Sequence, residues 1–174
     1  MRLTGLCFLI FLLHSCTPTE QNKKQKVAYF SLKNYFEKEA ERLNRLNFQI
    51  HKTVGINGVN EQKLVKINNF ENELNAFISS DINKASWRGA FTVKKDENLA
   101  LYTTENNKVP VKKVEIRYQN KKVKSIQIFL RTTNILYHSS DTLTYFPDRL
   151  YEIKKTQKIK LLEEKRYVVI GKFK

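Results

Sequence analysis

The second half of the chain alternates between apolar and polar residues with a period of two, which is the pattern of half-buried β-strands. Short polar breaks, from Asn106-Asn107 to Glu163-Glu164, divide the alternation into segments. Connections this short can join only antiparallel neighbours. The pattern therefore predicts an antiparallel meander of strands over residues 99–104, 109–119, 123–132, 135–146, 150–162 and 167–173.

The first half has the spacing of amphipathic helices instead. Apolar residues recur at helical spacing from Tyr29 to Leu46, with charged residues on the other face. A second helix is expected after Asn68, because Glu71 three residues later completes a sequence like a capping box. Its expected buried residues are Phe70, Leu74, Phe77, Ile78 and Ile82.

Between the two helices, alternating apolar residues from Phe48 to Ile67 are interrupted by Asn57-Gly58, a strong signal for a tight turn. This segment predicts a β-hairpin that joins the helices. The predicted fold class is therefore α+β, with two amphipathic helices packed on an antiparallel β-meander.

The hairpin VEIRYQNKKVKSIQIFL presents a choice of register. A two-residue turn would place Ile116 opposite Ser125, whereas a three-residue loop places Ile116 opposite Ile126. A slip of one residue moves the apolar set of a strand to the other face. We therefore predict the Ile116 to Ile126 pairing, a three-residue loop, and a left-handed backbone at Lys121 or Lys122.

The chain begins with a basic residue, Arg2, and an apolar run from Leu3 to Leu13. This arrangement is typical of a secretory signal peptide, and the run is too short to cross a bilayer as a helix. The sequence therefore predicts an exported protein.

The next residues, Leu13-His14-Ser15-Cys16, resemble the lipobox of bacterial lipoproteins, in which an aliphatic residue, a tolerant position and a small residue precede a cysteine. The resemblance implies that the signal is removed before Cys16, that its thiol is joined to diacylglycerol, and that the new amino terminus receives an acyl chain such as palmitate. Because no Asp follows the cysteine, it also implies the outer membrane of a Gram-negative envelope, with the protein facing the periplasm or the cell surface.

Removal of the signal would leave the mature domain without any further cysteine, because Cys7 lies inside the signal. No disulfide, thiolate metal site or cysteine nucleophile is then expected. Residues 17–26 contain no apolar side chain and are expected to form a flexible tether. The predicted organisation is a signal peptide at 1–15, a lipidated cysteine and tether at 16–26, and a single α+β domain at 27–174.

The chain is strongly basic, with 32 Lys and Arg, 17 Asp and Glu and a net charge of +15. A basic sheet would ordinarily suggest nucleic acid as a partner. An exported protein that is tethered to a membrane meets lipid headgroups, anionic envelope polymers and envelope proteins instead. The expected partners are therefore the membrane, through Cys16, and these envelope components, with no nucleic acid.

The segment His138-Ser139-Ser140-Asp141 contains the residue types of a catalytic triad. A triad, however, is assembled from separate elements, whereas these residues are consecutive. Neither His51 nor His138 has the spacing of a metal site, and the glycines form no phosphate loop. No catalytic residue, metal or cofactor is therefore assigned.

Five residues are candidates for recognition. Trp87 and Arg88 form an aromatic and cation pair in an expected loop, and Lys154, Lys158 and Lys160 lie on the polar face of a predicted strand. The alternatives are a tryptophan that closes the core and lysines that only keep the sheet face soluble.

The sequence thus predicts a membrane-anchored envelope lipoprotein with a non-enzymatic role in binding or assembly and an unknown partner. Two alternatives remain open. The strand tyrosines and Phe129 would line a cavity between helices and sheet in a carrier of an apolar ligand. Clustered carboxylates or a paired histidine in a cleft would indicate a hydrolase.

Overall fold

The computed structural model describes residues 29–47 and 49–174, so the predicted signal peptide, Cys16, the tether and Phe48 lie outside the described residues. The described part is rich in strands. Their bounds are β1 (Gln49–Ile56), β2 (Val59–Lys66), β3 (Thr92–Lys95), β4 (Leu99–Thr103), β5 (Val111–Gln119), β6 (Lys122–Thr133), β7 (Tyr137–Phe146), β8 (Leu150–Ile159) and β9 (Lys165–Phe173).

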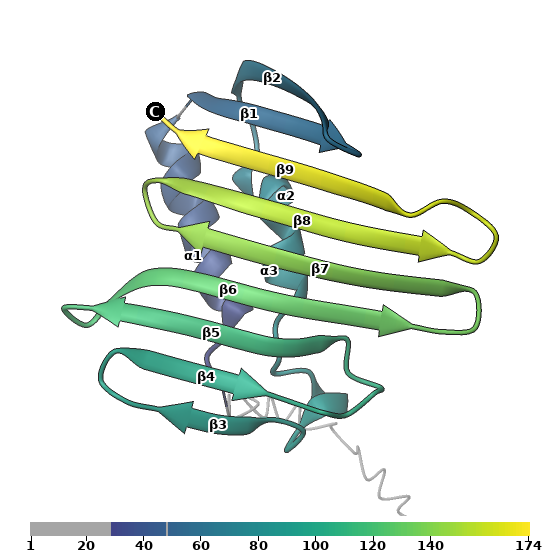
Figure 1. The fold of residues 1–174 in the computed structure, drawn as a ribbon. Helices are drawn as coiled ribbons and strands as arrows, with labels where there is room; N and C mark the ends of the chain where they lie inside the picture. Colours follow the sequence, from purple (N-terminus) through teal and green to yellow (C-terminus); the bar gives the residue numbers. More distant parts are fainter. Residues whose placement is uncertain (1–28, 48) are drawn as a thin grey trace, which may run out of the picture.

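These strands form one antiparallel sheet in the order β2-β1-β9-β8-β7-β6-β5-β4-β3 (Figure 1). The predicted antiparallel meander is confirmed from β4 to β9. The sequence did not predict β3, because all four of its residues are exposed and show no alternation of burial. The β1–β2 hairpin turns at Asn57 and Gly58, whose φ angles are 52° and 91°, and it joins the sheet beside the C-terminal strand β9.

The first predicted helix is confirmed as α1 (Leu32–Leu46), which buries Leu32, Phe36, Ala40 and Leu43. Its N-cap is Ser31, whose hydroxyl accepts the N–H of Asn34 at 3.1 Å, and it ends at Asn47 in the left-handed conformation.

The prediction of one continuous second helix is wrong. The segment forms two short helices, α2 (Phe70–Glu73) and α3 (Asn75–Ser79), followed by the 3-10 turn η1 (Ala85–Trp87). The cap is Asn69 rather than Asn68, because the Asn69 side chain accepts the N–H groups of Glu71 and Asn72 at 2.8 and 3.2 Å. Of the residues expected to be buried, Ile78 alone remains partly exposed.

The helices lie on one face of the sheet (Figure 1), and aromatic rings fill the contact between the layers. Phe36 of α1 meets Tyr145 of β7 edge to face, with ring centroids 5.1 Å apart. The hydroxyl of Tyr145 donates to Glu39 at 2.6 Å, and Arg42 joins Glu39 to Asp148. α1 is therefore attached to β7 by both apolar and polar contacts.

A second polar attachment holds α2. The hydroxyl of Tyr151 on β8 donates to Glu73, and the ammonium of Lys52 on β1 lies 2.7 Å from the same carboxylate. Burial, reinforced by the adjacent carboxylates, raises the pKa of both Tyr145 and Tyr151 well above the usual range for tyrosine.

The β5–β6 hairpin confirms the predicted pairing of Ile116 with Ile126, but the predicted three-residue loop is wrong. The turn has two residues, Asn120 and Lys121, both left-handed with φ angles of 52° and 60°. A β-bulge next to Arg117 shifts the register and absorbs the extra residue. Burial therefore sets the register, and a bulge reconciles it with the preferred turn.

The helices do not reach the far ends of β6 to β9, which extend to the right in Figure 1. We call this region, residues 131–140 and 156–168, the projecting end, and the part of the sheet beneath the helices the covered end. Facing the helices, Tyr145 is fully buried at the covered end, whereas Thr132 and Gln157, on the same face, belong to the projecting end. Where the helices stop, this face is less completely buried, and polar residues lie beside apolar ones such as Tyr137 and Ile159.

Candidate functional site

The outer face of the projecting end carries a depression of about 380 Å³. The register places two rows of residues side by side on this face, because directly paired residues in antiparallel strands share a face. The inner row is Arg131, Ser140, Thr156 and Arg166, and the outer row is Thr133, His138 and Lys158. Except for Arg166, these residues line the depression, together with Ser139 and Glu164.

The depression combines cations with hydroxyl groups. The guanidinium of Arg131 and the ammonium of Lys158 accompany the hydroxyls of Thr133, Ser140 and Thr156. Such a set of donors suits an anion that presents several oxygen atoms, such as a phosphate or a carboxylate. Acidic character is limited to Glu164, which forms an ion pair with Arg166 at 2.9 Å.

The residue types of a triad in segment 138–141 are not assembled into a catalytic group. Alternation along β7 places His138 on the outer face and Ser139 and Asp141 on the helix-facing side. Nδ1 of His138 lies 3.4 Å from the hydroxyl of Thr133, and the hydroxyl of Ser139 donates to Asp141. Within residues 29–47 and 49–174, no group of three or more His, Cys, Asp and Glu residues has the arrangement of a metal site.

Two loops border the depression at the tip of the sheet, the β6–β7 loop (residues 134–136) and the β8–β9 loop (residues 160–164). They lie side by side, because the backbone N–H of Lys160 donates to the carbonyl of Leu136 at 2.8 Å. Four large aliphatic side chains on these loops are exposed, Ile135, Leu136, Leu161 and Leu162.

The sequence analysis missed these four residues, because it assigned them to strands. Their signal was present in the sequence as two adjacent apolar pairs, Ile135-Leu136 and Leu161-Leu162. Adjacent apolar residues in a strand would point to opposite faces, so such pairs break the alternation and mark the end of a strand.

The structure does not bring the five predicted recognition residues together. The ammonium of Lys158 donates to the carbonyl of Leu162 at 2.6 Å, and Lys160 follows in the β8–β9 loop. Lys154 lies farther along β8 and pairs with Glu152 at 3.0 Å. Lys154 and Lys158 therefore lie on the outer face of β8, Lys160 lies beyond its end, and Lys158 alone among the three lines the depression.

Trp87 and Arg88 lie instead in the segment between α3 and β3, at the end of the 3-10 turn η1. Trp87 is half-buried against the core, and the ammonium of Lys84 stands 4.3 Å from its ring centroid. Arg88 is exposed. The prediction that Trp87 and Arg88 form a recognition tip remains open, but they are separate from the basic depression.

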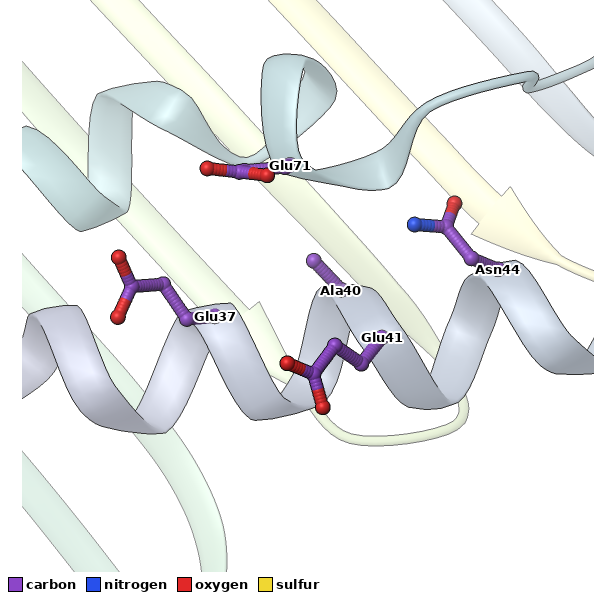
Figure 2. Close-up of a pocket in the computed structure, with 5 residues that line it drawn as sticks. All are labelled: Glu37, Ala40, Glu41, Asn44 and Glu71. Atoms are coloured by element: carbon purple, nitrogen blue, oxygen red, sulfur yellow. The ribbon is translucent and has the colours of Figure 1, made fainter.

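The helix layer has a depression of the opposite charge. Figure 2 shows Glu37 and Glu41 of α1 and Glu71 of α2 around a hollow of about 220 Å³. Asn44 at its end is engaged in structure, because its side-chain oxygen accepts the N–H of Phe70 at 2.9 Å. Glu37 also lies 3.8 Å from Lys33. These glutamates are thus on the helix layer, whereas the basic depression is on the outer face of the sheet.

Three of the six strand tyrosines that a carrier would need for its cavity are packed in the core instead. Tyr102, Tyr145 and Tyr151 are almost completely buried among core residues. Phe129, which a carrier would also need for its cavity, lies on the outer face, because it pairs with Lys113 and Thr142.

No family model, characterised protein or solved structure matches this chain. Among the helices that the structure describes, none has the length and hydropathy required to cross a membrane.

Proposed function

We propose that the chain is an envelope lipoprotein, anchored through lipidated Cys16 in the outer membrane and facing the periplasm or the cell surface. Its role is non-enzymatic binding of an anionic envelope component at the projecting end of the sheet. The proposal includes the α+β class, with α1 and the interrupted α2 and α3 segment as the two helical elements on the meander.

The lipobox-like residues before Cys16 support the anchor. The observation that carries the binding role is the depression on the outer face, where Arg131 and Lys158 stand among hydroxyl groups. A solvated sheet face needs no particular arrangement of its cations, whereas here two of them, Arg131 and Lys158, line one depression together with hydroxyl donors.

The anchor is tested by Cys16→Ser. Acyl chains supply most of the membrane affinity of a lipoprotein, and attraction between charges alone is weak and screened by salt. The variant is expected to leave the membrane fraction at high salt and to lose labelling by a fatty-acid probe, which the unaltered chain should incorporate. Labelling of Cys16→Ser by the fatty-acid probe to the same extent as the unaltered chain would contradict the anchor.

The binding role is tested with inorganic polyphosphate as the probe. The double variant Arg131→Gln and Lys158→Gln is expected to bind polyphosphate about tenfold more weakly, because it removes two contacts with charged groups. The control is Lys94→Gln with Lys121→Gln, which removes the same charge at positions outside the depression. Equal weakening in both variants would show that net charge, and not the depression, determines binding.

A further inference from the structure

Aliphatic side chains at the tip of the projecting end are largely exposed to solvent. Leu161 is 95% exposed and Ile135 88%, and their neighbours Leu162 and Leu136 are 54% and 62% exposed. Single exposed apolar residues are common on proteins, but contiguous groups mark an interaction site. The backbone hydrogen bond between the two loops places both apolar pairs side by side at the same end of the sheet.

The tip is held in a defined shape by hydrogen bonds. The N–H of Asn134 donates to the carbonyl of Tyr137 at 2.8 Å, and the N–H of Leu136 donates to the Asn134 side chain at 2.9 Å. In the second loop, Lys158 and the N–H of Leu162 make the bonds that close the turn. The aliphatic side chains therefore project from ordered turns.

Leu161 has an unfavourable backbone conformation for its residue type. Its φ is 69°, in the left-handed region that Gly and Asn adopt more readily than leucine. Its side chain gains no compensating burial, since it is almost fully exposed. A leucine here is understandable if the side chain contacts something outside the chain.

The surroundings of the tip are basic. Segments 131–138 and 158–166 contain five Lys and Arg residues against the two acids Glu163 and Glu164. Glu164 is already paired with Arg166. The depression with Arg131 and Lys158 lies on the adjoining outer face of the sheet, and Lys158 donates to the carbonyl of Leu162 in the tip.

This combination fits an anionic lipid surface better than a protein. A stable protein interface buries about 800 Å² on each partner, usually over a broad area. Narrow loop tips offer little area, but their side chains can enter the boundary between headgroups and acyl chains, while nearby lysines remain at the level of the phosphates. Electrostatic attraction to anionic lipids adds to the apolar contact.

We propose that the β6–β7 and β8–β9 loops insert Ile135, Leu136, Leu161 and Leu162 into an anionic bilayer, while the depression behind them receives lipid phosphate groups. The inference rests on the proposed binding role of the projecting end and names its partner. It does not require the lipid on Cys16, so the tip is a membrane contact separate from the anchor.

The test requires a signal from the tip itself, because an anchor would hold the whole chain on vesicles. A tryptophan reporter is introduced as L161W with the native tryptophan removed as W87F, in the full chain reconstituted on vesicles of phosphatidylethanolamine and phosphatidylglycerol with brominated acyl chains. The matched control is E97W with W87F, which places the reporter in the exposed β3–β4 turn at the opposite end of the strands (Figure 1).

We expect bromine to quench the L161W chain about twofold or more relative to the E97W chain, because residue 161 enters the acyl region. Quenching should fall on vesicles of neutral phosphatidylcholine and when Arg131→Gln and Lys158→Gln are added. Equal quenching of the two reporters, or equal quenching of L161W on anionic and neutral vesicles, would overturn the inference.

Hydrogen exchange on the unaltered chain gives a second readout that needs no substitution. Binding to anionic vesicles should slow exchange in residues 134–136 and 160–164 and leave residues 96–98 unchanged. Unchanged exchange at both loops would also overturn the inference. A chain that binds polyphosphate through Arg131 and Lys158 but shows no quenching of L161W would retain the proposed binding role and exclude the bilayer as its partner.

Discussion

The covered and projecting ends belong to the same strands but satisfy different requirements. At the covered end, β7 and β8 present Tyr145 and Tyr151 to the helices, fully buried and bonded to carboxylates. At the projecting end, the same strands continue into polar rows and then into exposed aliphatic loops. The difference indicates that the covered end provides stability, whereas residues of the projecting end are available for contact with another molecule.

The sharpest test of this comparison is Phe36→Ala. Phe36 is fully buried between α1 and the sheet and contacts Phe77 and Tyr145, so its removal leaves a cavity. We expect a loss of about 3 to 5 kcal/mol in the free energy of unfolding, measured by urea denaturation. The matched control is Phe129→Ala on the uncovered face, which should cost much less. Equal losses would break the comparison.

Gly171→Ala should have the next largest effect. A Cβ at this position would lie 2.2 Å from the ring of Tyr151, so the ring or strand β9 must shift. We expect a loss of about 2 kcal/mol, also from urea denaturation. In the chain carrying Tyr151→Leu, the added cost of Gly171→Ala should shrink, because the obstructing ring is absent. Additive effects would show that the close approach is not the cause.

Alkaline pH should lower the free energy of unfolding through two tyrosines of the covered end. Because the pKa of Tyr145 and Tyr151 is raised in the folded chain, their contribution to stability is complete below pH 10 and is lost as pH rises further. Above about pH 10 the unfolded chain releases these protons first, which lowers the free energy of unfolding by about 1.4 kcal/mol per pH unit for each tyrosine.

The measurement is a series of urea denaturations between neutral and alkaline pH. Tyr145→Phe should reduce the slope of the free energy of unfolding against pH above pH 10, because one of the two tyrosines no longer contributes. It also costs stability at neutral pH, because Glu39 loses a hydrogen-bond partner. An unchanged slope would mean that Tyr145 ionises normally in the folded chain.

The smallest change in stability is expected at the tip. Leu161→Asn removes an almost fully exposed side chain and introduces a residue that tolerates the left-handed backbone. The free energy of unfolding should change by no more than about 0.5 kcal/mol. The same substitution should weaken contact with anionic vesicles, which is measured by hydrogen exchange at residues 134–136. A large loss of stability would instead assign Leu161 to the fold.

The strand pattern was predictable because burial on one face imposes a period of two, and it fixed the pairing of Ile116 with Ile126. The interruption of the second helix was less predictable. The capping signal was recognised one residue early, at Asn68 instead of Asn69, and the interruption at Leu74 has no Gly or Pro to mark it in the sequence.

The candidate site was only partly predictable. Lys158 was recognised because it lies on the polar side of an alternating strand, but Arg131 and the hydroxyls of Ser140 and Thr156 were not. They come from three strands, and only the register aligns them in one place. A single sequence contains little information about such side-by-side arrangements, because their pairing is set by the whole sheet.

The position of β9 between β1 and β8 has a consequence for how the chain folds. β1 lies near the start of the described chain and β9 at its end, yet Ile50 pairs with Phe173. The β1–β2 hairpin cannot join the sheet until synthesis has delivered the last strand, so this closure involves a contact of very long sequence separation and is intrinsically slow. The edge of the sheet formed by β1 and β2 is therefore completed only after strands that are far apart in the sequence have both been synthesised.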